Sequence, residues 1–216
     1  MYSRTTRNVF IALASLLVLL LITYHGKEAK LLLRRMGKEP HRVGAIMPSS
    51  KVTASVMVRA ALQAFSIDND FIVELGPGTG VITHELLAQG VAPEKLVCVE
   101  LDPTLHKHMT EQFPALQIIL GDAAQLQNIL ADKCAKVGAI VSAIPMANLS
   151  VEKREEILQA CFAVLKPQGK IVQFTYQFKP ITTIPGLRRE FVKFVLWNMP
   201  PAFIWSLTKE EKQTNF

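Results

Sequence analysis

A glycine-rich turn between an apolar run and an amphipathic stretch indicates the class of fold. The apolar run is Phe71 to Leu75, the turn reads GPGTG over residues 76–80, and residues 81–89 repeat apolar positions at helical spacing. Glycines allow the backbone to turn sharply and to approach a ligand closely, and the first turn of a helix exposes free N–H groups. The pattern predicts a strand, a ligand-binding turn and a helix, which is the repeating unit of a parallel α/β sheet.

The same alternation of short apolar runs and longer amphipathic stretches continues to residue 175. The expected strands cover residues 71–75, 96–100, 116–120, 137–142 and 170–175, and the expected helices cover residues 81–89, 103–113, 124–131 and 151–165. Two further β-rich segments, residues 189–197 and 202–207, are joined by a Met-Pro-Pro turn, which suits an antiparallel hairpin. We therefore expect an α/β fold with a seven-stranded, mostly parallel sheet and a C-terminal antiparallel hairpin.

The N-terminal part differs from the rest in charge and hydropathy. Residues 1–60 hold ten Lys and Arg against two acids, whereas residues 61–216 hold 14 against 16, so the net charge of +6 arises in the N-terminal part. The run from Val9 to Tyr24 has 16 residues without a charge. A helix of that length covers about 24 Å, which is short of a hydrocarbon core of about 30 Å, so a membrane-spanning and an interfacial helix both stay open.

These features predict a membrane anchor ahead of one globular domain. A chain of 216 residues has room for one domain and an appendage, and we expect a hydrophobic anchor helix within residues 1–26, a basic linker over 27–42 and the domain over 43–216. Basic residues are more numerous after the apolar run than before it, which predicts that the domain faces the cytoplasm.

Acidic residues lie at the ends of the first three expected strands. Glu74 precedes Gly76 by two residues, Glu100 ends the second strand, and Asp122 follows the third in a Gly-Asp-Ala sequence. The carboxyl ends of parallel strands meet at one edge of the sheet, where a carboxylate at Glu100 can accept both hydroxyls of a ribose. A carboxylate at Asp122 can accept the exocyclic amine of an adenine. The three strand ends together predict a nucleoside-binding crevice.

The spacing Glu-x-Gly-x-Gly-x-Gly from Glu74 to Gly80 resembles motif I of the class I S-adenosylmethionine-dependent methyltransferases, which have a Rossmann-like fold. The acids after the second and third strands resemble the motifs that follow it. The resemblance implies S-adenosylmethionine as the cofactor. The residues that it implies for cofactor binding are Met47, Glu74, Gly76, Pro77, Gly78, Thr79, Gly80, Glu100, Leu101, Gly121, Asp122, Ala123 and Ser142.

The end of the fourth expected strand departs from the pattern of nucleic-acid amino-methyltransferases. The sequence SAIP over residues 142–145 stands where those enzymes resemble one another in an Asn or Asp, two prolines and an aromatic residue. The first position differs and the aromatic residue is missing. The basic charge also lies beside the apolar run and not on the domain. We therefore expect no nucleic-acid partner.

Five phrases carry a more specific resemblance. They are GAIMPSS at residues 44–50, VELGPGTGVIT at 73–83, SAIPMANL at 142–149, VQFTY at 172–176 and NMPPAFIW at 198–205. Together they resemble the bacterial phospholipid N-methyltransferases of the Rhodobacter type, a family that is similar to the ribosomal RNA adenine dimethylases. The resemblance covers residues 40–207. It implies methylation of the headgroup amine of phosphatidylethanolamine, towards phosphatidylcholine, by an enzyme at the bacterial inner membrane.

Other acceptors stay open at this point. They are an ornithine-type aminolipid, an apolar quinone-like molecule and adenine in ribosomal RNA, and a non-catalytic protein that binds S-adenosylmethionine at a membrane is a further alternative. A primary ammonium has a pKa near that of lysine, about 10.4, and has to lose a proton before it can accept a methyl group. A site for amines of rising methylation is expected to offer aromatic faces, because each methyl group removes a hydrogen-bond donor.

The remaining predictions concern the substrate and the partners. Tyr176, at the end of the fifth strand, supplies an aromatic face, and Arg188 and Arg189 can hold a lipid phosphate. The catalytic candidates are Tyr176, Ser142 and Pro145, and the substrate-binding candidates are Ser49, Ser50, Tyr176, Arg188 and Arg189. We expect a phospholipid membrane with anionic lipids as the partner. We expect no metal, because the five His and three Cys show no ligand spacing. The oligomeric state stays open.

Overall fold

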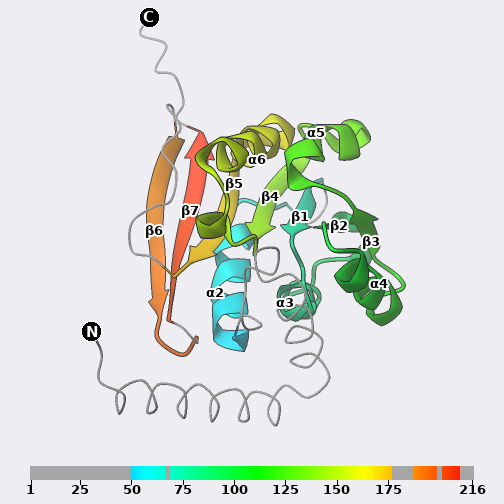
Figure 1. Cartoon of the computed structure of the whole chain (residues 1–216), viewed down its shortest axis with the longest axis horizontal. Helices are drawn as coiled ribbons and strands as arrows, with labels where there is room; N and C mark the ends of the chain where they lie inside the picture. Colours follow the sequence, from blue (N-terminus) through cyan, green and yellow to red (C-terminus); the bar gives the residue numbers. More distant parts are fainter. Residues whose placement is uncertain (1–49, 67–68, 177–186, 199–200, 210–216) are drawn as a thin grey trace, which may run out of the picture. The chain divides into compact units, whose positions relative to one another are not determined.

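The computed structural model describes residues 50–66, 69–176, 187–198 and 201–209. Within them the strands form a seven-stranded sheet in the order β3-β2-β1-β4-β5-β7-β6 (Figure 1). The strands are β1 Phe71–Leu75, β2 Leu96–Glu100, β3 Gln117–Leu120, β4 Val137–Ser142, β5 Leu165–Thr175, β6 Leu187–Val195 and β7 Ala202–Lys209. The first five are parallel, and β7 pairs antiparallel with both β5 and β6. The sheet expected from the sequence is confirmed.

The strand order reverses between β1 and β4. From β1 the chain continues outward to β2 and β3 on one side, and then returns to β4 and β5 on the other side. In an open α/β sheet such a reversal leaves a crevice at the carboxyl ends of the two central strands, because the helices after them pass to opposite faces. The ends of β1 and β4, at Leu75 and Ser142, are paired in register and border this crevice.

Helices cover both faces of the sheet. They are α2 Lys51–Leu62, α3 Val81–Ala88, α4 Pro103–Gln112, α5 Leu126–Ile129 and α6 Val151–Val164. One buried cluster joins α2 and α3 to residues such as Ile72 and Val141, and a second joins α5 and α6 to residues such as Val73 and Ile140. Neighbouring residues of a strand point to opposite faces, so almost every position in β1, β2 and β4 is buried.

Side-chain caps set the starts of the helices. Ser50 caps α2 by accepting from Thr53 N, Asp102 caps α4 ahead of Pro103, and Ser150 caps α6. The side chain of Ser50, a substrate-binding candidate, thus caps a helix. Met47 and Ser49, which precede it, lie outside the described residues.

The start of β5 differs most from the sequence prediction, and the start of β6 differs as well. The fifth strand begins at Leu165, because the Lys166-Pro167-Gln168-Gly169 turn runs directly into it with Gln168 at φ +61°. The first strand of the hairpin, expected from residue 189, is β6, which starts at Leu187 and pairs with β7 along its length. Backbone pairing with β7 extends the strand beyond the apolar residues that mark it in the sequence.

The predicted location in the bacterial inner membrane is corrected. Within the four described ranges, no helix has the length and apolar character needed to cross a membrane. The longest of them, α6, has 14 residues against the about 20 that a crossing requires. The apolar run Val9 to Tyr24, the residue ranges assigned to an anchor and a linker, and the N-terminal hydrophobic helix lie outside the described residues.

Candidate cofactor and acceptor site

The glycine turn leaves open space at the carboxyl end of β1. Gly76 and Gly78 have φ values of +67° and +61°, which residues with a side chain rarely adopt. A Cβ at Gly78 would meet only the Gly76 carbonyl oxygen, at 4.0 Å, whereas a Cβ at Gly76 would lie 3.4 Å from Ile144 Cγ1. The backbone at Gly78 is therefore accessible to a ligand, while Gly76 packs against the loop after β4.

Glu74 lies beneath this turn and is fully buried. Its Oε2 accepts a hydrogen bond of 2.6 Å from Thr83 Oγ1 on α3, and Cys98 Sγ of β2 lies 3.7 Å from the same oxygen. Its Oε1 has no hydrogen-bond partner among the described residues. Burial raises the pKa of Glu74 from its ordinary value of 4.5 to about 7, although the hydrogen bonds from Thr83 and Cys98 oppose the shift. An unpartnered oxygen in this position is an acceptor that a bound ligand or its water can use.

Glu100 spans the gap between the ends of β1 and β2. Its Oε2 accepts from Gly78 N at 3.1 Å and its Oε1 accepts from Asp102 N at 2.9 Å. Burial raises the pKa of this carboxyl, and the two backbone hydrogen bonds oppose the shift. The next residue, Leu101, is 63% exposed at the same edge. The Glu100 carboxylate has a fixed orientation that suits the hydroxyls of a ribose, and the exposed side chain of Leu101 suits the base attached to that ribose.

Asp122 follows β3, and an ion pair holds it in place. Its Oδ1 accepts from Ala124 N at 2.9 Å, and its Oδ2 lies 2.8 Å from Lys153 Nζ on α6. Burial alone would raise the pKa of Asp122, but the hydrogen bonds from Lys153 and Ala124 outweigh it and lower the pKa. Ala123 is buried beside it. An adenine amine bound by Asp122 has to share the carboxylate with Lys153.

These residues fit S-adenosylmethionine. The cofactor carries a ribose, an adenine and a cationic amino-acid end, and the edge of the sheet presents an acceptor for each. Glu100 and Asp122 would hold the ribose and the adenine, with Leu101 against the ring. The open backbone at Gly78 and the unpartnered oxygen of Glu74 would receive the amino-acid end. Among the described residues, no group of three or more His, Cys, Asp and Glu is placed to hold a metal ion.

We expect Glu100→Ala to weaken S-adenosylmethionine binding about 30-fold, because it removes a buried charged acceptor whose hydrogen bonds contribute about 2 kcal/mol. Isothermal titration calorimetry measures this affinity. Glu94→Ala is the matched control, since Glu94 is an exposed acid just before β2, at the opposite end of the same strand. Equal affinities for the two variants would remove Glu100 from the site.

On the other side of the crevice, four polar residues from three segments form one cluster. Asn198 Oδ1 accepts from Ser50 N at 2.9 Å and from Thr53 Oγ1 at 2.8 Å. The Asn198 side chain also hydrogen-bonds Tyr176, while burial raises the pKa of the Tyr176 hydroxyl overall. Phe174 packs edge-on against the Tyr176 ring, with 5.5 Å between the ring centroids. The cluster holds the Tyr176 ring at the carboxyl end of β5.

Asn198 and Thr53 are missing from the residues predicted from the sequence. Asn198 is the first residue of the NMPP phrase and is 5% exposed. A polar residue ahead of two prolines indicates a structured turn, but nothing in the sequence says that it meets a serine 148 positions away. Only the pairing of β7 with β5 brings it there.

Ser142 and Pro145 border the crevice from the end of β4. Ser142 is 1% exposed, and its Oγ lies 3.4 Å from Ile144 N, within its own turn. Pro145 is half-buried. Their assignment as catalytic residues stays a prediction.

Arg188 and Arg189 are not brought to this edge. Arg188 is the register partner of Thr208 in β7, and Thr208 is the register partner of Lys170 in β5. Lys170 lies five residues before the end of β5, so Arg188 lies about 16 Å from the carboxyl edge. Arg189 is the next residue of β6 and so points to the other face of the sheet. Burial lowers the pKa of Arg189. The two side chains therefore do not form one phosphate clamp beside the cofactor site.

Comparison with known proteins agrees with this site. A family model described as "Methyltransferase domain" matches residues 72–169. An ornithine lipid N-methyltransferase of Singulisphaera acidiphila is 27% identical over 190 residues, which cover 82% of this chain and 93% of that protein. Ribosomal RNA small subunit methyltransferase A of Mycoplasmopsis synoviae is 30% identical over 89 residues, which cover 41% of this chain and only 33% of that protein.

Solved structures agree on the fold. A TehB-like SAM-dependent methyltransferase from Corynebacterium glutamicum superposes with a TM-score of 0.51 at 22% identity. The superposition covers 72% of this chain and 87% of that one.

The similarity to RNA methyltransferases corrects the prediction that this chain has no nucleic-acid partner. The SAIP sequence and the charge of the domain led to that prediction. A ribosomal RNA methyltransferase, however, is 30% identical to this chain over 89 residues. The exclusion of nucleic acid is therefore wrong, because this chain is similar to proteins that methylate RNA. The comparisons likewise give no support to a phospholipid membrane as its partner.

The strand order, the open glycine turn and the acids at the ends of β2 and β3 agree with the family match and with the relatives. The chain is therefore an S-adenosylmethionine-dependent methyltransferase whose described part is a class I methyltransferase domain.

Proposed function

We propose that this methyltransferase N-methylates the primary amine of an aminolipid, with ornithine lipid and phosphatidylethanolamine as the two candidate acceptors. The observation that carries the proposal is the extent of the similarity to an ornithine lipid N-methyltransferase, which runs through 93% of that protein. The similarity to the ribosomal RNA methyltransferase is limited to a third of its length. The match covers 82% of this chain, which supports an acceptor of the same chemical class.

The acceptor side of the crevice suits an amine. Bound S-adenosylmethionine carries a methyl group on its sulfonium sulfur. A neutral amine takes this methyl group from the sulfur and then releases a proton. Tyr176 offers an aromatic face that attracts the substrate while it is an ammonium and tolerates each added methyl group. Asn198 keeps that ring in place through a hydrogen bond with the hydroxyl. Positioning of the amine can supply most of the rate enhancement, because the neutral amine is already a nucleophile.

Replacing Tyr176 tests this role. We expect Tyr176→Ala to lower turnover about 30-fold, and Tyr176→Phe only a few-fold, because phenylalanine keeps the aromatic face and loses the hydrogen bond to Asn198. Turnover is measured as transfer of labelled methyl groups, alongside the affinity for S-adenosylmethionine, which should not change. Phe191→Ala, on the edge strand β6, is the aromatic control. Unchanged turnover in both Tyr176 variants would exclude this residue from the acceptor site.

The identity of the acceptor is tested by offering three candidate acceptors in separate samples. Purified full-length protein is given methyl-labelled S-adenosylmethionine with mixed micelles of ornithine lipid, with micelles of phosphatidylethanolamine, or with ribosomal RNA, and each product is separated by chromatography. Label in either lipid, reduced in Glu100→Ala at limiting S-adenosylmethionine, supports the proposal and identifies the headgroup. Label in RNA alone would replace the lipid acceptor by a nucleic acid. No label in any arm, with cofactor binding verified by calorimetry, would also overturn the proposal.

A further inference from the structure

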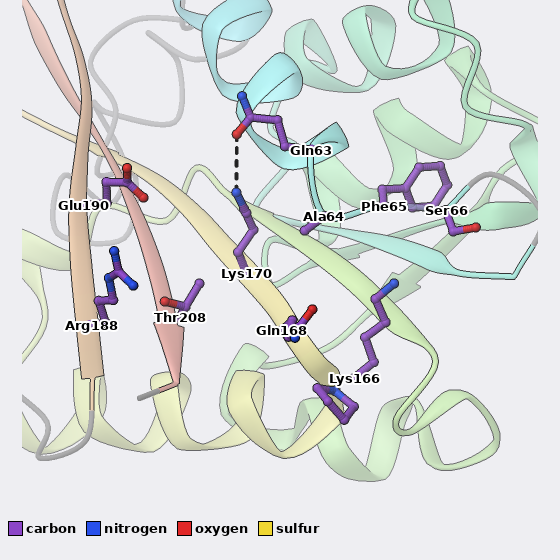
Figure 2. Close-up of a pocket in the computed structure, with 11 residues that line it drawn as sticks. Gln63, Ala64, Phe65, Ser66, Lys166, Gln168, Lys170, Arg188, Glu190 and Thr208 are labelled. Atoms are coloured by element: carbon purple, nitrogen blue, oxygen red, sulfur yellow. Dashed lines mark hydrogen bonds between the residues drawn. The ribbon is translucent and has the colours of Figure 1, made fainter. Parts of the chain in front are cut away.

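A second pocket lies at the opposite end of the strands from the glycine turn. It has a volume of about 640 Å³ and lies between the C-terminal end of α2 and one face of β5, β7 and β6 (Figure 2). This volume is within the range of pockets that hold small molecules. Neither the cofactor site nor the Tyr176 cluster uses any of the residues that line it.

Three side chains form a row across this pocket. Lys170 of β5 is the register partner of Thr208 of β7, and Thr208 is the register partner of Arg188 of β6. Residues paired in this way point to the same face, and neighbouring strands are about 4.8 Å apart, so the Cα atoms of the two basic residues lie about 10 Å from each other. Figure 2 shows the three side chains from neighbouring strands along this face. A hydroxyl between two cations is an arrangement that suits an oxyanion.

Neither of these two basic side chains has an acidic partner. Lys170 Nζ donates a weak hydrogen bond of 3.4 Å to the neutral Gln63 amide, and no ion pair within the described ranges involves Lys170 or Arg188. The third cation, Lys166, differs, because its Nζ lies 2.5 Å from Oδ2 of the buried Asp70. The pocket therefore holds two cations that form no ion pair with an acid in the described ranges.

The surrounding charge favours a small anion over a long polyanion. Glu190, two residues after Arg188 on the same face of β6, also lines the pocket. A long polyanion that runs along this face would therefore meet the Glu190 carboxylate. A single phosphate needs only the two cations and the hydroxyl.

The position of the row separates this pocket from the methyl-transfer site. Lys170 precedes the carboxyl end of β5 by five residues, or about 16 Å. A phosphate held here cannot belong to a headgroup whose amine lies next to Tyr176, because phosphate and amine are only two carbons apart in phosphatidylethanolamine. The ligand is therefore a second molecule, and this inference does not depend on which acceptor the enzyme methylates.

We propose that this pocket binds the phosphate group of a small soluble molecule. Lys170 and Arg188 hold the phosphate oxygens from two sides, and Thr208 Oγ donates a hydrogen bond between them. Gln168 and Gln63, on the rim, offer amides to the rest of the ligand.

Calorimetric titration of the full-length protein with inorganic phosphate and with glycerol 3-phosphate, in a phosphate-free buffer, tests the proposal. We expect saturable binding that weakens about 150-fold in the Lys170→Gln/Arg188→Gln double variant, since each of the two charged hydrogen bonds contributes about 1.5 kcal/mol. Arg188→Lys, which keeps the charge, should retain more of the affinity than Arg188→Gln. The matched control is Arg59→Gln, which removes an exposed cation from α2 outside the pocket.

The affinity for S-adenosylmethionine, measured on the same samples, reports whether each variant is folded. It should be equal in wild type and double variant, because the two sites lie at opposite ends of the strands. Phosphate binding that is absent, or that is equal in wild type and double variant, would overturn the proposal. Binding that is seen only with vesicles containing phosphatidylglycerol, and not with either soluble probe, would overturn it as well.

Discussion

The Glu74→Gln variant is expected to lose much less stability than the wild type when the pH rises from about 5 to about 8. The pKa of Glu74 is raised from 4.5 to about 7 by burial. The folded protein thus keeps a proton in a pH range where the unfolded chain has released it. The stabilising contribution of this group is fully present below 4.5, the pKa in the unfolded chain, and is lost as the pH rises through about 7, the pKa in the folded protein. The loss from this group is about 3 kcal/mol at pH 8, at 1.36 kcal/mol per pKa unit.

Urea unfolding of ligand-free protein across this pH range measures the effect. Glutamine keeps the shape and a hydrogen-bond acceptor for Thr83 but cannot ionise, so the difference in unfolding free energy between the two proteins should grow with pH. Glu111→Gln, at an exposed acid of α4, is the control and should follow the wild type. Parallel pH curves for wild type and Glu74→Gln would mean that this carboxyl does not titrate in the folded state near neutral pH.

The Glu74→Gln variant also tests whether this carboxyl binds the cofactor. If the unpartnered Oε1 serves the cofactor, the variant gains stability at pH 8 and binds S-adenosylmethionine more weakly. A buried acid that costs stability in the empty protein is characteristic of a functional site.

Gly80→Ala is expected to destabilise the protein by about 3 kcal/mol. Gly80 precedes α3 with φ +84°, a conformation that costs a residue with a side chain about 1 to 2 kcal/mol. A Cβ there would lie 2.6 Å from the Phe113 ring and 3.1 Å from Met109 Sδ, both of which are buried. Forcing this contact apart costs about 1 to 3 kcal/mol more. Thermal or urea unfolding measures the loss.

Gly90→Ala separates the two contributions. Gly90 has nearly the same conformation, with φ +90°, but a Cβ there meets nothing within 4 Å. We expect this variant to lose only the backbone contribution, about 1 kcal/mol. If both variants lose the same amount, the Phe113 ring moves aside without cost and the contact at Gly80 is not a steric limit.

The cofactor half of the site could be predicted from the sequence because its signals are local. Glu100 and Asp122 each end a short apolar run, and the expected strands at residues 71–75, 96–100 and 137–142 agree with the structure to the residue. Parallel strands place their carboxyl ends at one edge, so a residue that follows a strand is assigned to that edge by its position alone. The ion pair of Asp122 with Lys153 could not be predicted in the same way, because it depends on how α6 packs.

The acceptor half could not be predicted, because residues distant in the sequence make it. Asn198 meets Ser50 and Thr53 only after β7 has paired with β5, and Tyr176 takes its place from the same pairing. Arg188 illustrates the opposite case, in which a residue assigned to the acceptor site lies far from it. The antiparallel register of β6 and β7 places it at the other end of the strands, opposite Lys170.

The sequence by itself determined the α/β class, the order of strands and helices and the carboxylates of the cofactor site. Hydrophobic periodicity and turn residues act over a few positions, and they suffice for these features. Only the tertiary structure decided which face each residue of the C-terminal hairpin occupies. It also decided that Glu74 is buried with one oxygen unpartnered and that Lys170 and Arg188 share a second pocket. Register and burial depend on strand pairing between distant segments, where a shift of one residue reverses every side chain.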